Sequence, residues 1–398
     1  MAVFNKATIL LPENADYEKW SVVACDQYTS EKEYWERVKE RVLDAPSTLN
    51  LVYPEAFLSE GDARIEKINS YMEKYLKDGI FKEYKDCYVY IERTLSRGRI
   101  RRGIVGVIDL EEYDFSKGSK SKIRATEGTV AERIPPRVKI RENASLELPH
   151  AILLIDDKND EIIPKNGEGT PVYDFELMEN GGHIKGWIID GEKADKITES
   201  FEKYALGAKD GLVFAVGDGN HSLATAKTCW ENIKKNLSDK EKENHPARFC
   251  LAEVENLYDT ALEFEPIHRV LFDVEPKAVL ESLKEFSKNQ QGENTHKIRY
   301  VFNGEEGEAE LKNAVSNLAV GEIQSFIDKM GYEVDYIHGE DTTKRLGTKE
   351  NAFGIILSSM EKESLFETVI KDGALPRKTF SMGEAHEKRF YMEAKKIK

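Results

Sequence analysis

The sequence contains little cysteine, and its cysteines are not paired. Only four of the 398 residues are cysteine, and no two of them have a C-x-x-C spacing; they are Cys25, Cys87, Cys229 and Cys250. Scattered cysteines of this kind favour buried thiols in a reducing compartment over a disulfide framework or a zinc site. The sequence therefore predicts a cytoplasmic protein.

Long apolar runs are also missing. No apolar stretch approaches the 18 residues that a membrane-spanning helix needs. The apolar patch Ala7–Leu11 is too short for the core of a signal peptide, and acidic residues follow it. We therefore expect no contact with a membrane.

The chain has fewer positively charged than negatively charged residues. The chain has 58 Lys and Arg residues against 73 Asp and Glu residues, which gives a formal net charge of −15. A protein that binds nucleic acid along its length needs a basic face to neutralise phosphates, so this balance argues against nucleic acid as the main partner. A small-molecule ligand is the partner we expect, and the sequence does not determine the oligomeric state.

Apolar patterns typical of helices and of buried strands alternate along the chain. Helical spacing of apolar residues in Asp62–Lys77 and an unbroken apolar run in Ala151–Ile155 are examples. We predict an α/β to α+β fold, with a mixed central β-sheet flanked by helices and a smaller inserted βα unit. The predicted boundaries are a main domain over residues 1–270, the insertion over 271–340, and a segment over 341–398 that returns to the main domain.

The most informative stretch is Gly211–Ala226, GLVFAVGDGNHSLATA. Leu212–Val216 has the pattern of a strand buried on both faces, and the residues from Leu223 onward have that of a helix. Between them lies a short polar turn, with Asp218, Gly219, Asn220, His221 and Ser222. Such a turn directs backbone N–H groups and the positive end of a helix dipole at one point, which suits a phosphate or carboxylate. Alternatively, it is an ordinary turn in which Asn220 or Ser222 caps the helix.

Three further polar clusters stand beside apolar runs. The first contains Thr126, Glu127, Thr129 and Arg133, the second is the pair His268-Arg269, and the third contains His338, Glu340 and Asp341. A metal site built from His221, His268 and His338 is conceivable, but histidines scattered in this way are common by chance. Arg133, Arg137 and Arg141 are spaced four apart, which would align them on a helix, although Pro135-Pro136 weakens a helical interpretation. The H-E-x-x-H spacing of zinc proteases and the G-x-S-x-G nucleophile elbow are both absent.

These segments together resemble the prokaryotic family known as domain of unknown function 1015. Val216–Ala226 resembles its A-D-G-H-H-R-Y-x-T-A signature, Thr126–Thr129 its H-E-x-T segment, and Pro266–Val270 its P-x-H-R turn. Asp26 stands where the family has a Tyr-Asp pair, and Asp372–Leu375 resembles a late D-G-A-L. The resemblance implies a relation to the ParB/sulfiredoxin-like nucleotide-binding fold, in which this turn holds phosphates; one branch of that fold phosphorylates free serine.

The chain departs from the family pattern at several of these positions. Asn220 and Ser222 replace His and Arg in the turn, Thr126 replaces a His, and Cys25 replaces the Tyr before Asp26. The arginine that would contact a phosphate from the turn is therefore missing. It would have to come from elsewhere, with Arg133, Arg141 and Arg269 as candidates. The chain accordingly resembles a divergent subgroup of this family, whose ligand can differ from that of the other members.

From these observations we predict a nucleotide-dependent phosphotransferase that acts on a small polar metabolite, with an amino acid such as serine as one candidate. The cofactors would be Mg²⁺, held at Asp218, and a nucleoside di- or triphosphate. The candidate catalytic residues are Glu127, Asp26, His221 and His268. The candidate phosphate-binding residues are Asp218, Gly219, Asn220, His221, Ser222, Arg133, Arg141 and Arg269. Two alternatives are a non-catalytic module that binds a nucleotide or metabolite, and a scaffold whose polar motifs form structural networks.

Overall fold

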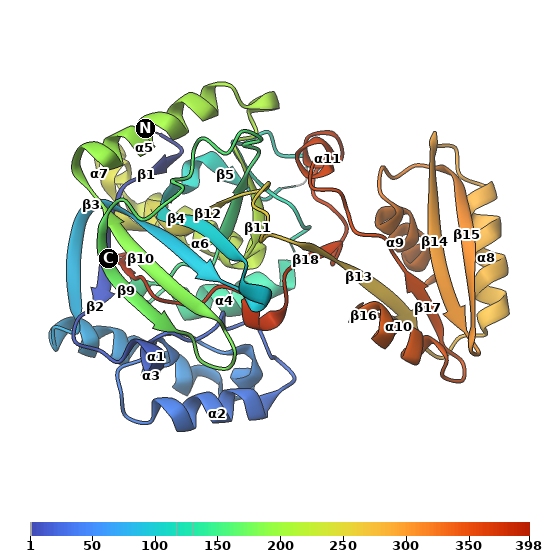
Figure 1. The fold of residues 1–398 in the computed structure, drawn as a ribbon, viewed down its shortest axis with the longest axis horizontal. Coiled ribbons are helices and arrows are strands. Elements are labelled where there is room, and N and C mark those ends of the chain that lie inside the picture. Colours follow the sequence, from blue (N-terminus) through green and yellow to red (C-terminus); the bar gives the residue numbers. More distant parts are fainter. Residues whose placement is uncertain (1, 117, 130) are drawn as a thin grey trace. The chain divides into compact units, whose positions relative to one another are not determined.

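The structure is a computed structural model that describes residues 2–116, 118–129 and 131–398. The chain forms two compact units. The first comprises Met1–Leu262 and Glu384–Lys398, and the second comprises Glu263–Gly383. Figure 1 shows the elements of both.

A mixed β-sheet forms the centre of the first unit. Its strands follow the order β5-β6-β11-β8-β12-β4-β3-β10-β9, with β1 beside β4 and β2 beside β3. The pairs β11–β6 and β12–β8 are parallel, whereas β11–β8 and β12–β4 are antiparallel. The strands are β1 (Phe4–Asn5), β2 (Ala7–Pro12), β3 (Phe81–Thr94), β4 (Ile100–Asp109), β5 (Tyr113–Asp114), β6 (Ile123–Ala125), β8 (Ile152–Ile155), β9 (Thr170–Glu176), β10 (His183–Ile189), β11 (Phe214–Asp218) and β12 (Phe249–Asn256). The predicted mixed central sheet is confirmed.

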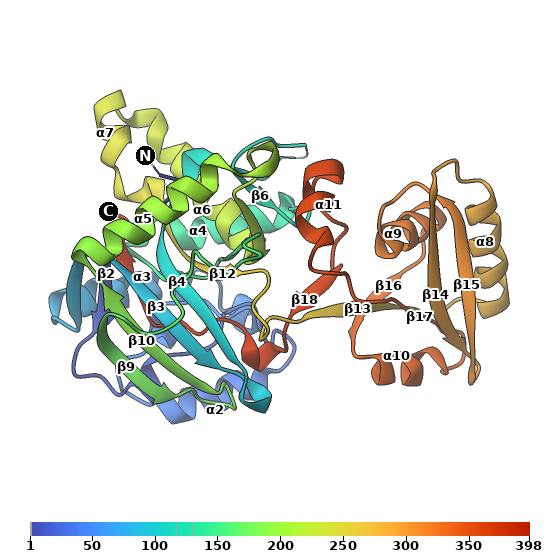
Figure 2. The ribbon, with the colours of Figure 1, turned by 45° about the horizontal axis from the view of Figure 1, so that its top comes forward.

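Helices cover both faces of this sheet (Figure 2). Successive residues of a strand point to opposite faces, so Val89 packs in one hydrophobic core and its neighbour Tyr88 in another. The first core includes residues of α2 and α3, and the second includes residues of α5 and α6. The helices are α1 (Tyr17–Trp20), α2 (Lys32–Val42), α3 (Gly61–Lys77), α4 (Ile134–Arg141), α5 (Gly191–Leu206), α6 (Asn220–Ile233) and α7 (Asp239–Asn244).

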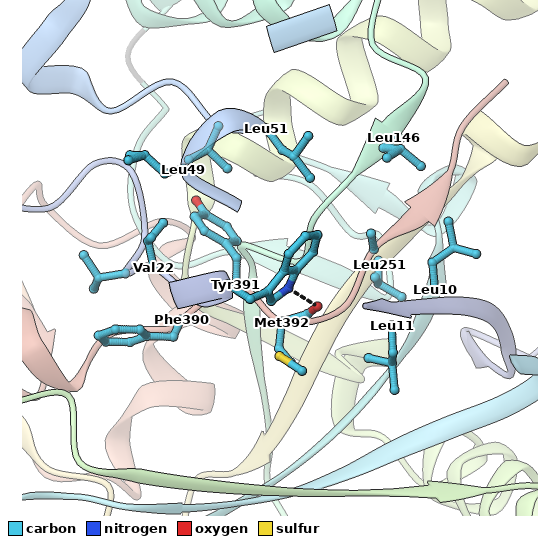
Figure 3. Packing of buried hydrophobic residues seen from close by; sticks show 14 of the residues in the cluster. Leu10, Leu11, Val22, Leu49, Leu51, Leu146, Leu251, Phe390, Tyr391 and Met392 are labelled. Atoms are coloured by element: carbon cyan, nitrogen blue, oxygen red, sulfur yellow. Dashed lines mark hydrogen bonds between the residues drawn. The ribbon is translucent and has the colours of Figure 1, made fainter. Parts of the chain in front are cut away.

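The last segment of the chain, residues 384–398, runs through the first of these cores. Figure 3 shows Phe390, Tyr391 and Met392 of this segment among Leu10, Val22 and other side chains. The indole Nε1 of Trp20 donates a hydrogen bond of 3.1 Å to the carbonyl of Met392. Farther along, β19 (Lys395–Lys396) pairs with β7 (Leu146–Glu147). The C-terminal segment is thus an integral part of the first unit.

The second unit has its own sheet and its own hydrophobic core. Its strands follow the order β15-β14-β17-β13-β16, and β18 also pairs with β13. They are β13 (Phe264–Leu271), β14 (Asn294–Phe302), β15 (Glu305–Ala314), β16 (Val334–His338), β17 (Phe353–Ile356) and β18 (Phe380–Met382). The helices are α8 (Pro276–Lys288), α9 (Ala319–Met330), α10 (Glu340–Gly347) and α11 (Ser364–Asp372).

The boundaries of this unit differ from those expected from the sequence, which were 271 and 340. The unit starts earlier because β13 belongs to its sheet, and it ends later because β17 and β18 pair with β13. The segment that returns to the first unit is correspondingly short and begins at Glu384 rather than at residue 341.

Candidate functional site

The turn between β11 and α6 forms the centre of the candidate site. The strand ends at Asp218, Gly219 adopts a left-handed conformation with φ +82°, and the helix begins at Asn220. A Cβ atom at Gly219 would lie 2.8 Å from Ala151 Cα and 3.0 Å from the His150 ring, so only glycine fits both the conformation and the space. Gly219 itself occupies the N-cap position, with no side-chain cap. The alternative in which Asn220 or Ser222 caps the helix is therefore wrong.

Asp218 holds this turn from its first residue. Its Oδ1 accepts a hydrogen bond of 2.8 Å from the backbone N–H of Gly219. Its Oδ2 lies 3.0 Å from Nζ of Lys388, whose side chain is only 10% exposed. The C-terminal segment thus contributes a cation to the turn.

The Thr126 segment meets the turn at the same edge of the sheet. Thr126 directly follows β6, which is the parallel neighbour of β11, so the carboxyl ends of the two strands lie side by side. The backbone N–H of Thr126 donates to Asn220 Oδ1 at 3.2 Å, and Thr126 Oγ1 donates to the Val216 carbonyl at 2.5 Å. Two of the polar clusters identified in the sequence therefore meet, which brings Glu127, next to Thr126 and half-buried, into the neighbourhood of the turn.

An acid–base pair lies against Gly219. The Nε2 atom of His150 is 3.5 Å from Asp26 Oδ2, and its Nδ1 shares a hydrogen bond of 2.6 Å with the Tyr391 hydroxyl. Burial raises the pKa of Asp26, but the charge of His150 and its hydrogen bond outweigh burial and hold that pKa well below the usual range. Burial lowers the pKa of His150, but Tyr391 and Asp26 raise it well above its usual value. The pair is thus an imidazolium and a carboxylate at neutral pH.

The hydroxyl of Tyr391 connects this pair to Cys25. It accepts a hydrogen bond of 3.2 Å from the Cys25 backbone N–H and donates one of 3.3 Å to the Cys25 thiol. Burial, together with the nearby Cys25, raises the pKa of Tyr391, so its hydroxyl stays neutral. Tyr391 therefore holds His150 in place.

The arginines of the α4 region occupy different surroundings. The Pro135-Pro136 pair stands in the first turn of α4, where proline is tolerated, so the row from Arg137 to Arg141 is helical after all. Arg137 pairs with Glu55. Burial raises the pKa of the Glu55 carboxyl and so does the charge of Asp26, whereas the charge of Arg137 only partly opposes this rise. Arg141 pairs instead with the buried Glu147. Arg133 is exposed, and its charge acts on Glu55.

His268 and Arg269 lie in β13 of the second unit and are both buried. His268 Nδ1 accepts a hydrogen bond of 3.2 Å from the Leu357 backbone N–H, and its pKa is lowered to about 4, chiefly by burial. Arg269 donates to the carbonyls of Lys378 at 2.8 Å and Arg377 at 2.9 Å. Each residue thus has a structural role within its own unit, and their participation in a site with the turn stays a prediction.

The residues around the turn do not form a ready-made metal site. Within residues 2–116, 118–129 and 131–398, no group of three or more His, Cys, Asp and Glu side chains is arranged to hold a metal ion. Both carboxylate oxygens of Asp218 already have partners, the Gly219 N–H and the Lys388 ammonium. Asp218 therefore fits a metal ion only if Lys388 moves away.

The chain matches, over residues 9–330, the family described as "Protein of unknown function (DUF1015)". It belongs to this family. No curated protein is significantly similar to it. In the part of the chain that the structure describes, no helix is long and apolar enough to cross a membrane.

Several solved structures are similar at low sequence identity. C-terminally truncated SbnI from Staphylococcus aureus is 10% identical, with a TM-score of 0.38 over 70% of this chain and 82% of that chain. A variant of a free serine kinase in complex with AMP is 12% identical, with a TM-score of 0.38 over 72% and 96%. A conserved hypothetical protein from Pyrococcus furiosus is 12% identical, with a TM-score of 0.34 over 68% and 91%.

Sequence analysis missed three residues at the turn: His150, Lys388 and Tyr391. His150 has one weak signal, since it stands just before the buried run Ala151–Ile155. Lys388 and Tyr391 belong to a C-terminal stretch of mixed charged and aromatic residues, which has no motif. Only the packing of that stretch into the first core brings them to the turn.

Proposed function

We propose that the turn before α6 binds the phosphates of a nucleoside di- or triphosphate, and that the first unit transfers a phosphoryl group to a small hydroxyl-bearing metabolite. The observation that carries this proposal is the position of the Asp26–His150 pair against Gly219. An ionised carboxylate and a turn suited to phosphate are thereby neighbours. Phosphoryl transfer requires mainly such positioning, together with neutralisation of charge.

The phosphate end of the ligand would meet positive charge from several sources. The first N–H groups of an α-helix have no partner within the helix, and the helix dipole adds partial positive charge there. Lys388 and the His150 imidazolium add full charges beside the same turn. Lys388 and His150 would thus supply the positive charge of the arginine that Ser222 replaces in the family signature.

The acceptor hydroxyl needs a carboxylate to take its proton as its oxygen bonds to phosphorus and the bond to the nucleotide breaks. Asp26 is ionised at neutral pH, and its side chain is 32% exposed, so a substrate can reach it. Glu127 is the other candidate, because its neighbour Thr126 is hydrogen-bonded to the first residue of α6. A free amino acid such as serine is the first acceptor to test.

In this proposal, Mg²⁺ would bind together with the nucleotide. Mg²⁺ commonly binds through substrate phosphates and only one or two protein carboxylates. It would neutralise phosphate charge, and Asp218 would be its ligand if Lys388 turned to the phosphates instead. The steps assigned above to Asp26, Glu127 and the turn do not depend on it.

A thermal-shift screen of ATP, ADP, CTP and GTP, with and without Mg²⁺, tests the binding step. A ligand present at a hundred times its Kd stabilises the protein by about 2.7 kcal/mol, which raises the melting temperature measurably. If no nucleotide shifts the melting of the wild type, the phosphotransfer proposal is overturned in favour of a module that binds another metabolite.

Matched amide variants test the chemical step. Asp26→Asn and Glu127→Gln each remove a proton acceptor but keep the size of the side chain. The variant of the true base should lower turnover by roughly 10²–10⁴ while nucleotide binding persists. Glu132→Gln, which changes an exposed residue of the same segment as Glu127, is the control and should keep full turnover. Full turnover in both Asp26→Asn and Glu127→Gln would exclude carboxylate base catalysis at this turn.

A further inference from the structure

A polar cavity lies at the opposite end of α6 from the turn. It has a volume of about 470 Å³, within the range that small-molecule sites occupy. It is lined by Glu111, Trp230, Lys234, Lys235, Lys242 and Arg248. Trp230 follows Asn220 by ten residues of helix, which places it about 15 Å away along the axis. The cavity is therefore separate from the candidate site.

The one carboxylate in the lining is already neutralised. Glu111 Oε1 accepts a hydrogen bond of 2.5 Å from the indole Nε1 of Trp230. The same oxygen lies 3.0 Å from Nζ of Lys234, which also pairs with Glu231 at 2.7 Å. Glu231 has a second cationic partner, Lys227, at 2.8 Å. Because Trp230 is buried, this arrangement fixes one wall of the cavity. Glu111 therefore adds little repulsion toward an anion.

The other three cations have partners of very different strength. Arg248 is held by two hydrogen bonds, of 2.9 and 2.6 Å, to the buried carboxylate of Asp109. Lys242 pairs with Asp239, whose side chain is 99% exposed, and such solvated pairs contribute little. Lys235 donates to the amide oxygen of Asn232, and no carboxylate among the described residues lies within 4.0 Å of its ammonium. Both Lys235 and Lys242 can therefore turn their ammonium groups to an anion in the cavity at little cost.

We propose that this cavity binds a small anion carrying two or more negative charges, of the phosphate or pyrophosphate class. Ammonium groups from two separate elements, Lys235 in the 3₁₀ turn after α6 and Lys242 in α7, line one hollow. One anion can bridge both lysines, and charge-assisted hydrogen bonds to phosphate oxygens are short and strong. The proposal does not depend on the nucleotide proposal, because it uses none of the residues at the turn.

Calorimetric titration of the full chain with inorganic pyrophosphate at about 0.1 M salt tests this inference. Pyrophosphate should bind to the wild type and change its tryptophan fluorescence, since Trp230 lines the cavity. The double variant Lys235→Ala/Lys242→Ala should bind about a hundredfold more weakly, because each lost charged contact accounts for about tenfold. Circular dichroism verifies that this variant is folded.

Lys240→Ala is the matched control, because Lys240 is an exposed lysine of α7 outside the cavity lining. Its affinity for pyrophosphate should stay within about twofold of the wild type, since its contribution is screened by salt. The inference is overturned if the wild type does not bind pyrophosphate, or if the double variant binds as tightly as the wild type. An equal loss of affinity in Lys240→Ala, or equal binding of citrate, would overturn a phosphate site at this cavity.

Discussion

The backbone N–H of Thr126 donates a hydrogen bond to the side-chain oxygen of Asn220, 94 residues further along the chain. In the reverse direction, Asn220 Nδ2 donates to Thr126 Oγ1 at 3.4 Å. Both residues are buried. The side chain of Asn220 thus joins the end of β6 to the start of α6, which follows β11.

Replacing Asn220 with alanine should destabilise the first unit by about 1–3 kcal/mol, because the buried N–H of Thr126 loses its acceptor. Urea unfolding followed by tryptophan fluorescence measures this unit, since all four tryptophans lie in it. Ser222 lies in the first turn of α6 and not in the polar turn to which the sequence assigns it, because the helix begins at Asn220. Ser222→Ala changes this half-buried residue and serves as the control, with an effect of less than about 0.5 kcal/mol. Equal unfolding free energies for the two variants would show that the Thr126–Asn220 contact is unimportant for stability.

The Asp26–His150 pair predicts a stability difference that depends on pH. The pKa of His150 is raised in the folded state, so its contribution is complete below the usual histidine pKa of 6.5 and is lost as pH rises through the raised value. The pKa of Asp26 is lowered, so its contribution is present above 3.8 and is lost as pH falls through the lowered value. The excess stability of wild type over His150→Gln should therefore be greatest between about pH 5 and 6.5.

Melting temperatures of the two proteins from pH 4 to pH 10 would reveal this window. His150→Gln keeps a hydrogen-bonding side chain but cannot become charged. The difference should shrink at alkaline pH as the wild-type imidazolium loses its proton. A difference that stays constant across the range would mean that the pair is not ionised in the folded protein.

Arg389 is predicted to be essential for the fold of the first unit. It lies between the carboxylates of Glu253 and Glu393, and all three side chains are at most 4% exposed. Arg389→Met leaves two buried carboxylates without their cation, which should cost about 3–5 kcal/mol. Lys396→Ala in the same segment breaks only the partly exposed pair with Glu83 and should cost less than about 1 kcal/mol. Chemical denaturation compares the two, and similar losses would contradict the prediction.

In the second unit, His268 should lower the stability of the folded state at mildly acidic pH. Its pKa is lowered to about 4 in the folded protein, mainly by burial, against 6.5 when unfolded. The unfolded chain thus binds the proton first, and stability falls as pH drops from about 6.5 to 4. His268→Asn keeps an acceptor for the Leu357 N–H and cannot be charged, so its loss over this range should be smaller.

Because no tryptophan lies in residues 263–383, hydrogen exchange of β13 and β17 is the suitable measurement for this variant. Protection of these strands in the wild type should decrease between pH 6.5 and 4 after correction for intrinsic exchange. An identical decrease in His268→Asn would assign the acid sensitivity to other groups.

Much of the fold class and the central turn could be predicted from the sequence because their signals are local. Leu212–Val216 is an apolar run and Gly219 follows it within three residues, so strand, turn and helix can be read from consecutive residues. The alternation of helical and strand patterns likewise indicates a mixed sheet. The pattern of each single helix or strand depends on residues near one another in the sequence, so it can be recognised without knowing how the elements pair.

The tertiary structure alone decided which distant side chains surround that turn. His150 and Asp26 meet, and Lys388 reaches Asp218, through packing of segments whose own patterns say nothing about their partners. The limits of the second unit follow in the same way from the pairing of β13 with β17 and β18. Any apolar strand can pair with several others, and the choice is made by burial and hydrogen bonding over the whole unit. Local sequence determines the elements, whereas their long-range packing determines the site.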